Sequence, residues 1–260
     1  MIRSLWIAKT GMEGQQNKLD AISNNLANVG TNGFKRGGVQ FEDLMYQNLR
    51  PAGSATSEQT QLPTGLQVGL GVRTAASTRS FTQGALQNTG NNLDVAIQGQ
   101  GFFQIQMPDG STGYTRDGSF QLDSGGQMVT NQGYVLQPGI TVPANALSVN
   151  IAPDGQVQAT VPGQTALQNL GQIQIANFIN PAGLESRGGN LFAETAASGA
   201  PQAAAPDSNG LGRLQKGYLE ASNVNVVEEL VSMIATQRAY ELNSKAIQTS
   251  DQMLQRLGQL

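Results

Sequence analysis

The chain contains no cysteine and no histidine among its 260 residues. Without these side chains it can form no thiolate nucleophile, no imidazole base and no Cys/His zinc site, so a Ser-His-Asp triad and most hydrolase mechanisms are excluded. Disulfides are excluded as well, which is compatible with work outside the reducing cytoplasm. We therefore expect no enzymatic activity, no catalytic residue, no cofactor and no metal ion.

Charged residues are also scarce, at 13% of the chain against roughly 25% in an average soluble protein. With 15 basic and 18 acidic residues the chain has no cluster of Lys or Arg that could neutralise phosphates, so we expect no nucleic-acid partner. No run reaches the roughly 18 consecutive apolar residues of a membrane span, so we expect no membrane insertion. The opening MIRSLWIAKTGMEGQQ lacks the pattern of a cleavable signal peptide, so export would use a route that keeps this segment.

Apolar residues recur in steps of three and four near the N-terminus, as they do on one face of a helix. Apart from Gln15, the stripe consists of Leu5, Ala8, Met12, Leu19, Ile22, Leu26 and Val29. Gly30 and the following Thr31-Asn32-Gly33 predict the end of the helix. We expect this helix to run from about Ser4 to Val29.

A second stripe, with a period of seven, lies near the C-terminus and predicts a helix that supercoils against a partner. It consists of Val226, Met233, Tyr240, Ile247 and Leu254. Ser222 and Asn223 are typical N-cap residues, and the helix is expected to reach about Leu257. The companion column is Leu230, Gln237, Ser244 and Asp251. Its polar residues could set the register of a two-helix pair, face a water-filled lumen in a ring of copies, or lie at the solvated edge of a monomeric hairpin.

Neither stripe can stay in water without cost, because each large apolar side chain contributes about 1.5 to 3 kcal/mol when it is buried. No neighbouring segment covers these stripes. The two ends must therefore pack on each other, on copies of themselves, or on both. This pattern is typical of a chain that assembles with itself.

The middle of the chain predicts β structure. Short alternating runs around residues 103–107, 149–151 and 173–175 are separated by Gly, Pro, Asn and Asp turn signals, which favours a small sandwich, barrel or meander. The residues Val39, Phe41, Leu44 and Met45 fit either a helical turn or a strand. We therefore predict an α+β fold in which the N- and C-terminal helices pair as a coiled coil and flank a central all-β domain.

The segment from Arg50 to Gly65 has almost no large apolar residue and cannot fold alone. It is either a disordered surface loop or an arm ordered by neighbouring subunits. The predicted organisation is a discontinuous helical assembly domain (1–34 and 218–260), an extended arm and connector with some β structure (35–95), a β domain (96–195) and a return linker (196–217).

Two pairs of adjacent acids, Glu42-Asp43 and Glu228-Glu229, could suggest a glycosidase, which needs two acids across a scissile bond. Adjacent residues on a helix do not face each other, so we interpret the second pair as favourable charges near a helix N-terminus. Asp207-Ser208-Asn209-Gly210 matches only the start of a calcium loop. These residues are therefore interpreted as helix-end and turn residues.

Three parts of the chain resemble the bacterial flagellar rod and hook proteins. They are ISNNLANVGTNGFKR (Ile22 to Arg36), GQGFFQI with YTRDGSFQLD (Gly99 to Ile105 and Tyr114 to Asp123) and ASNVNVVEELVSMIATQRAYELNSKAIQTSDQML (Ala221 to Leu254). The motif Asn24, Asn25, Leu26, Ala27 and Asn28 is specific to that family. The total length, the opening SLWIAKTGM and the arm YQNLRPAGSATSEQTQLPTG are similar to the distal rod members. Hook members would be longer and proximal rod members shorter, and these remain the alternatives within the family.

The resemblance implies a homopolymer, a rigid hollow helical tube that crosses the periplasm, transmits torque to the hook and surrounds an export channel. An arm marked by Tyr46, Arg50, Pro51, Pro63 and Gly65 would brace neighbouring subunits. The implied partners are the proximal rod proteins, the hook protein, the surrounding basal-body rings and the flagellar type III export apparatus. An alternative of a different class is a coiled-coil β adhesin.

Overall fold

The computed structural model describes residues 2–53, 55–57, 60–61, 63–163 and 166–257. The chain divides into two compact units. The helical unit comprises Met1–Ala27, Gly37–Thr78 and Asn225–Leu260, and the β unit comprises Asn28–Arg36 and Arg79–Val224. The α+β class predicted from the sequence is confirmed, with a helix at each end of the chain and β structure between them.

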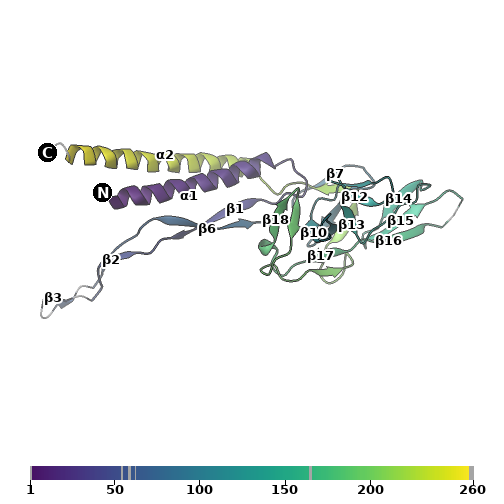
Figure 1. Ribbon diagram of the computed structural model, residues 1–260, viewed down its shortest axis with the longest axis horizontal. Coiled ribbons are helices and arrows are strands. Elements are labelled where there is room, and N and C mark those ends of the chain that lie inside the picture. Colours follow the sequence, from purple (N-terminus) through teal and green to yellow (C-terminus); the bar gives the residue numbers. More distant parts are fainter. Residues whose placement is uncertain (1, 54, 58–59, 62, 164–165, 258–260) are drawn as a thin grey trace. The chain divides into compact units, whose positions relative to one another are not determined.

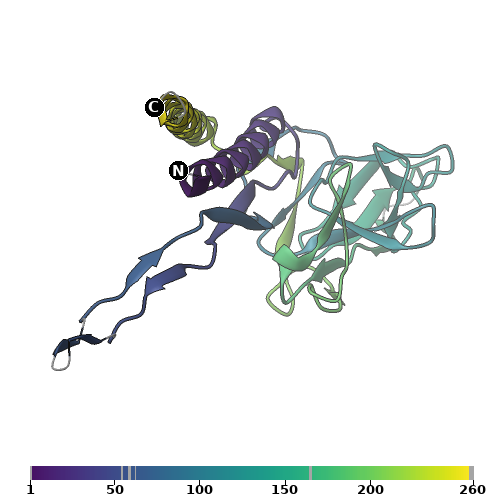
Figure 2. The same cartoon turned by 60° about the vertical axis from the view of Figure 1, so that its left-hand side comes forward.

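Two long antiparallel helices dominate the helical unit. Helices α1 (Ile2–Ala27) and α2 (Val226–Leu257) lie side by side, with the two chain ends at the same end of the pair (Figures 1 and 2). The first turn of α2 is capped by Asn225, whose Oδ1 accepts a hydrogen bond from the Val227 amide at 3.0 Å. The predicted N-cap at Ser222 or Asn223 is therefore wrong, and Asn223 instead accepts a hydrogen bond from the Arg36 amide at 2.7 Å.

A two-stranded ribbon completes the helical unit (Figure 2). It consists of β1 (Gly37–Asp43) with β6 (Val72–Arg79), β2 (Gln47–Arg50) with β5 (Leu66–Val68), and β3 (Ala55–Ser57) with β4 (Thr60–Gln61). Residues 37–43 are thus a strand, which decides the alternative left open by the sequence. The expected arm is the far part of this ribbon, of which residues 54, 58–59 and 62 lie outside the described residues.

A nine-stranded sheet forms most of the β unit. Its main path is β11-β12-β13-β9-β10-β19-β18, while β17 pairs with β9 and β20 pairs with β17. These strands are β9 (Phe102–Gln106), β10 (Thr112–Thr115), β11 (Phe120–Leu122), β12 (Met128–Thr130), β13 (Val135–Gln137), β17 (Ile175–Asn177), β18 (Glu185–Gly188), β19 (Leu191–Ala193) and β20 (Gln202–Ala204). A 3-10 turn, η1 (Pro181–Gly183), precedes β18. The turns between β9 and β10, between β11 and β12, and between β12 and β13 fall on the expected Gly, Pro, Asn and Asp residues.

Three smaller sheets complete the β unit. They are β14 (Ser148–Ile151), β15 (Gln156–Thr160) and β16 (Gln168–Gln172); β8 (Val95–Gln98) with β21 (Arg213–Lys216); and β7 (Leu86–Asn88) with β22 (Tyr218–Glu220). Strands β20 and β21 come from the segment 196–217 expected to be a return linker. The last two pairings join residues more than 100 positions apart, and the sequence did not predict them.

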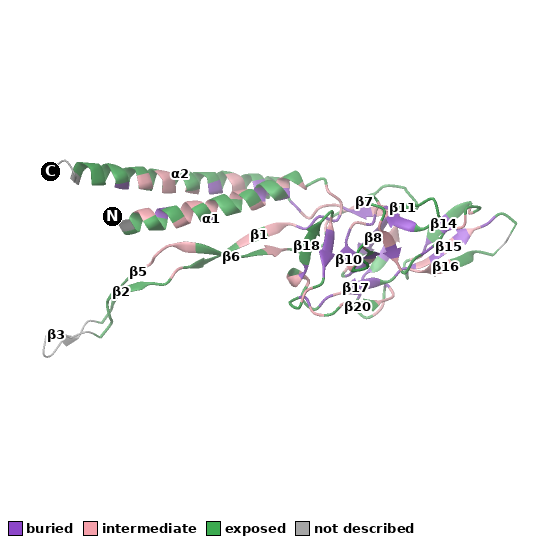
Figure 3. Ribbon diagram, in the orientation of Figure 1, coloured by how far each residue is buried: buried purple, intermediate pink, exposed green. Residues whose placement is uncertain are grey.

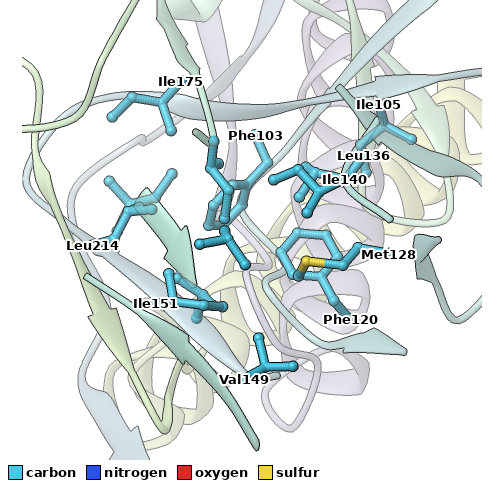
Figure 4. Packing of buried hydrophobic residues seen from close by; sticks show 14 of the residues in the cluster. Phe103, Ile105, Phe120, Met128, Leu136, Ile140, Val149, Ile151, Ile175 and Leu214 are labelled. Carbon is cyan, nitrogen blue, oxygen red and sulfur yellow. The ribbon is translucent and has the colours of Figure 1, made fainter. Parts of the chain in front are cut away.

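The core of the β unit is apolar. Phe103, Ile105 and Ile175, from the predicted alternating runs, are fully buried together with Phe120, Met128 and Leu136 (Figure 4). A second cluster contains Phe102, Tyr114, Phe178 and Phe192, whose rings pack edge to face. Gly118 allows the backbone to come close to this core, because a Cβ there would lie 1.6 Å from the Val95 carbonyl oxygen.

Candidate assembly surface

The most deeply buried residues of α2 are polar. Glu229, Thr236 and Ser250 are 1%, 1% and 6% exposed and are spaced by seven or fourteen residues, with half-buried Asn243 in the same column. On α1, Asn25 Nδ2 lies 3.4 Å from Glu229 Oε2, and Ser4 Oγ lies 3.4 Å from Ser250 Oγ. A Cβ on Gly11 would lie 2.9 Å from Asn243 Nδ2. We call these residues, Ser4, Gly11, Asn25, Glu229, Thr236, Asn243 and Ser250, the polar seam.

The predicted apolar column of α2 lies beside this seam and is not its centre. Val226, Tyr240 and Leu254 are 37%, 38% and 36% exposed, while Met233 and Ile247 are half-buried. In the companion column, Leu230, Gln237 and Asp251 are exposed and Ser244 is half-buried. Within one chain, neighbouring residues therefore cover these side chains only in part.

A further apolar stripe on α2 was missed by the sequence analysis. Val227, Val231 and Ile234 are 69%, 62% and 59% exposed, and Leu242 continues their line. At 3.6 residues per turn this line lies on the side of the helix roughly opposite the polar seam. We call these four residues the exposed stripe. Its spacing of four, three and eight residues places the four side chains on one face of a helix and could have been found in the sequence. The sequence analysis considered only the column with a strict period of seven.

The predicted stripe on α1 is more nearly covered. Ala8 and Ile22 are buried, Leu5, Met12, Leu19 and Leu26 are half-buried, and Val29, beyond the helix, is exposed. The ribbon also contacts α1. Gly14 is buried and faces the Phe41 ring, to which an added Cβ would come within 3.3 Å, and Asn17 Nδ2 donates to Thr74 Oγ1 at 3.0 Å. Helix α1 is thus held between α2 and the ribbon.

Asn25, from the predicted family motif, joins three elements of the helical unit. Its side chain is 2% exposed and makes two 2.8 Å hydrogen bonds with the backbone of Gly37, donating to the carbonyl and accepting from the amide. The same Nδ2 faces Glu229 in the first turn of α2. Of the other motif residues, Leu26 and Asn28 are half-buried, and Asn24 and Ala27 are exposed. Asn25 therefore fixes where α1, β1 and α2 meet.

The arm exposes apolar side chains near its base. Met45, Tyr46, Leu49 and Leu66 are 84%, 53%, 49% and 55% exposed. Strands β2 and β5 approach closely at Gly65, where an added Cβ would lie 2.7 Å from the Arg50 carbonyl oxygen. The prolines of the arm, Pro51 and Pro63, are exposed. In Figure 3 the strands of the ribbon are mostly exposed or half-buried, whereas the strands of the β unit contain many buried residues.

The β unit contains one buried ionic cluster, which we define as Lys35, Arg116 and Glu220. Lys35 Nζ lies 2.6 Å from Glu220 Oε1, and both side chains are 0% exposed. Arg116 Nε lies 3.6 Å from Glu220 Oε2, with its side chain 4% exposed. Burial lowers the pKa of Lys35, with the Glu220 charge opposing this shift, and burial also lowers the pKa of Arg116. The sequence analysis quoted Lys35 and Arg116 only as parts of the family-like segments and assigned them no role.

The described residues offer little that could bind a metal ion or cross a membrane. Its His, Cys, Asp and Glu residues form no group of three that could hold a metal ion. Its helices include none that is long and apolar enough to cross a membrane. The surfaces of the helical unit are therefore the candidate functional surfaces.

Three family models match the chain. They are the flagella basal body rod protein model at residues 5–35, the flagellar hook protein FlgE/F/G D1 domain model at 96–159 and the flagellar basal body rod FlgEFG protein C-terminal model at 215–260. The flagellar basal-body rod protein FlgG of Buchnera aphidicola subsp. Acyrthosiphon pisum is 58% identical over 260 residues, which is all of both chains. The chain belongs to the FlgG family of flagellar basal-body rod proteins.

Other FlgG proteins match over nearly the same span. The protein of Caulobacter vibrioides is 50% identical over 260 residues, covering 100% of this chain and 99% of its own. The protein of Bacillus subtilis is 42% identical over 265 residues, again with 100% and 99% covered. FlgG membership identifies the chain as a structural rod protein. Each matched segment also contributes one residue of the ionic cluster: Lys35, Arg116 and Glu220.

Proposed function

We propose that this chain is a subunit of the distal rod of the flagellum and has no enzymatic activity. Many copies assemble into a rigid hollow helical tube, which serves as drive shaft and export channel between the motor and the hook and is required for motility. The single observation that carries this proposal is the inverted polarity of helix α2. Its buried seam is polar and its exposed stripe is apolar.

A second copy of the chain is the partner that fits the exposed stripe. Val227, Val231 and Ile234 recur along successive turns, so one helix of a neighbouring copy can cover them in a continuous contact. Each such side chain contributes about 1.5 to 3 kcal/mol when it is fully buried. The net charge of only −3 on 260 residues opposes the approach of identical copies weakly.

The apolar column of Val226, Met233, Tyr240, Ile247 and Leu254 lies on the other side of α2, beside the polar seam. Its exposed members, Val226, Tyr240 and Leu254, offer a second apolar contact to another copy in this proposal. The polar column beside it, Gln237, Ser244 and Asp251, faces the lumen in this proposal. Polar side chains that border a water-filled channel need no protein partner, because water satisfies their hydrogen bonds. The exposure of Gln237 and Asp251 supports this assignment.

The proposed partners beyond the homopolymer are proximal rod proteins, the hook protein, the surrounding basal-body rings and the flagellar type III export apparatus. The proposed location is the periplasm-spanning rod. Assembly in that compartment requires no disulfide, and the chain has no cysteine.

Electron microscopy of the purified chain tests assembly directly. We expect tubes from the wild type, and no tubes from Met233→Asp, Ile247→Asp or Ile234→Asp, because each change places a charge in the contact between copies. The matched variant Ile234→Val keeps an apolar side chain and should still assemble. Near-ultraviolet circular dichroism should show a folded β unit in all four variants. Small oligomers from the wild type, as a coiled-coil β adhesin would form, or normal tubes from the Asp variants, would contradict the proposal.

The arm is proposed to brace neighbouring subunits and to make the tube stiff. The exposure of Met45, Tyr46 and Leu49 supports a contact with another copy. Deleting residues 46–65 should leave tubes that bend more, which persistence lengths measured on electron micrographs would reveal. If tubes of the deletion variant are as straight as wild-type tubes, the arm does not stiffen the polymer.

A further inference from the structure

The ionic cluster lies where the two ends of the β unit meet in the fold. Lys35 lies in the first segment of this unit, residues 28–36, and Glu220 lies in β22, four residues before the unit ends at Val224. These segments also touch through the backbone, since the Gly33 amide donates to the Glu220 carbonyl at 2.7 Å. Arg116 comes from the middle of the chain. The cluster therefore joins the beginning, the middle and the end of the β unit.

The carboxylate of Glu220 is the centre of this cluster. Its Oε1 accepts hydrogen bonds from Lys35 Nζ at 2.6 Å and from the Gly84 amide at 2.9 Å. Lys35 Nζ also donates to the Thr82 carbonyl at 2.9 Å, and Arg116 Nη2 donates to the Gly99 carbonyl at 2.7 Å. Each cation is thus held to the β unit by one carbonyl and to Glu220 by charge.

The charges of this cluster do not balance. Two cations share one carboxylate, and Arg116 Nε and Nη1 and Glu220 Oε2 are buried without a hydrogen-bond partner. The Arg116 guanidinium also lies 5.6 Å from the Phe102 ring centroid, which stabilises a cation only partly. A buried charge whose partner is removed is strongly destabilising, whereas an intact buried pair adds little net stability. Among the three residues, the loss of the Glu220 carboxylate should therefore destabilise the β unit most.

We propose that Lys35, Arg116 and Glu220 form a closing device that lets the first segment of the β unit dock only when β22 is in place. Without the Glu220 carboxylate, docking residues 28–36 brings a second cation to buried Arg116. With it, both cations acquire their counter-ion at once. The docking of the two ends is thereby coupled, and a chain whose C-terminal part is not yet seated cannot complete the N-terminal connection.

The close approach of the first segment to Arg116 supports this coupling. Gly33 has φ +68°, and a Cβ there would lie 2.7 Å from the Asp117 amide nitrogen, so this turn packs directly on residues 116–117. Asn190 Nδ2 also donates to the Asn32 carbonyl at 2.9 Å. Lys35 therefore cannot avoid Arg116 while the segment remains docked.

Limited trypsin digestion of the full-length chain tests this device, because the Arg36 backbone is held by Ser80 and Asn223 and becomes cleavable only when the segment opens. In Glu220→Gln we expect cleavage after Arg36 to accelerate by about tenfold or more relative to cleavage after exposed Arg187. The matched control Asp154→Asn, at an exposed turn of the same unit that is distant in sequence from both cleavage sites, should leave the ratio unchanged.

The second arm of the experiment is the double variant Lys35→Met/Glu220→Gln, which removes one cation together with the carboxylate. Coupling predicts that the double variant opens less than Glu220→Gln alone. If Glu220→Gln unfolds the whole β unit, the same comparison is made on the recovery of folded protein. The inference is overturned if cleavage at Arg36 is unchanged in Glu220→Gln, or if adding Lys35→Met makes opening worse or leaves it as it was.

Discussion

The β unit and helix α2 bury opposite kinds of side chain. In the β unit, Phe103, Ile105 and Leu136 are 0% exposed, and the buried charges of Lys35, Arg116 and Glu220 share one cluster. In the helix pair, Thr236 and Ser250 are buried while Ile234 remains 59% exposed. The β unit therefore obtains its hydrophobic stabilisation within one chain. The helix pair leaves apolar side chains of α2 uncovered within one chain, and the proposed contacts between copies would cover them.

The largest test of this comparison is truncation of an apolar side chain in each region. Phe103→Ala removes a ring that packs edge to face on Phe120 at 5.1 Å, so the free energy of unfolding of the β unit should fall by about 3 to 5 kcal/mol. Ile234→Ala should change the stability of the unpolymerised chain by less than about 0.5 kcal/mol. Urea unfolding of both variants measures the contrast. Equal losses would mean that Ile234 is already buried in the free chain.

Unfolding at alkaline pH tests whether the β unit keeps the Tyr114 phenol away from water. Burial, then the charge of Glu194 and its hydrogen bond with the phenol, raises the pKa of Tyr114 to about 12. The folded state then keeps this proton above pH 10 while the unfolded chain loses it, so the stabilisation is complete below pH 10 and falls as the pH rises through 12. Wild type should lose about 2 kcal/mol more than Tyr114→Phe between pH 10 and pH 12.

The measurement is the free energy of unfolding in urea at several pH values. Glu194→Gln should show an intermediate loss, because it removes the charge but leaves the phenol buried. Identical pH profiles for wild type and Tyr114→Phe would show that the phenol is hydrated in the folded chain.

The smallest expected effect concerns the polar seam. Asn25→Ala leaves the Gly37 backbone groups and buried Glu229 without this partner, which should destabilise the helical unit by about 1 to 2 kcal/mol. Hydrogen exchange along α1 and α2 measures the loss. The control Gln16→Ala, at an exposed position of α1, should remain within about 0.5 kcal/mol of wild type. If Asn25→Ala leaves the stability of the helical unit unchanged, water satisfies these groups and the seam does not set the position of the helices.

Comparison of prediction and structure shows where local patterns suffice. The helices at both ends, the alternating strands around Phe103 and Ile175 and the turns between them follow from periods of 3.6 and two and from Gly, Pro and Asp residues. The start of α2 was misplaced because Ser222, Asn223 and Asn225 are all good cap residues, and only the packing of Asn223 against residue 36 removes it from the choice.

The amino-acid sequence by itself determined the element types, the α+β class, the apolar stripes that need partners and, through its motifs, the family. The tertiary structure alone decided which neighbouring column of α2 faces α1, because columns three or four residues apart lie on nearly the same side of a helix. It also decided that Lys35, Arg116 and Glu220 meet, since no local pattern links residues 81 and 104 positions apart. Side-chain periodicity is a property of a few turns of chain, whereas the pairing of distant charges depends on the whole path of the backbone.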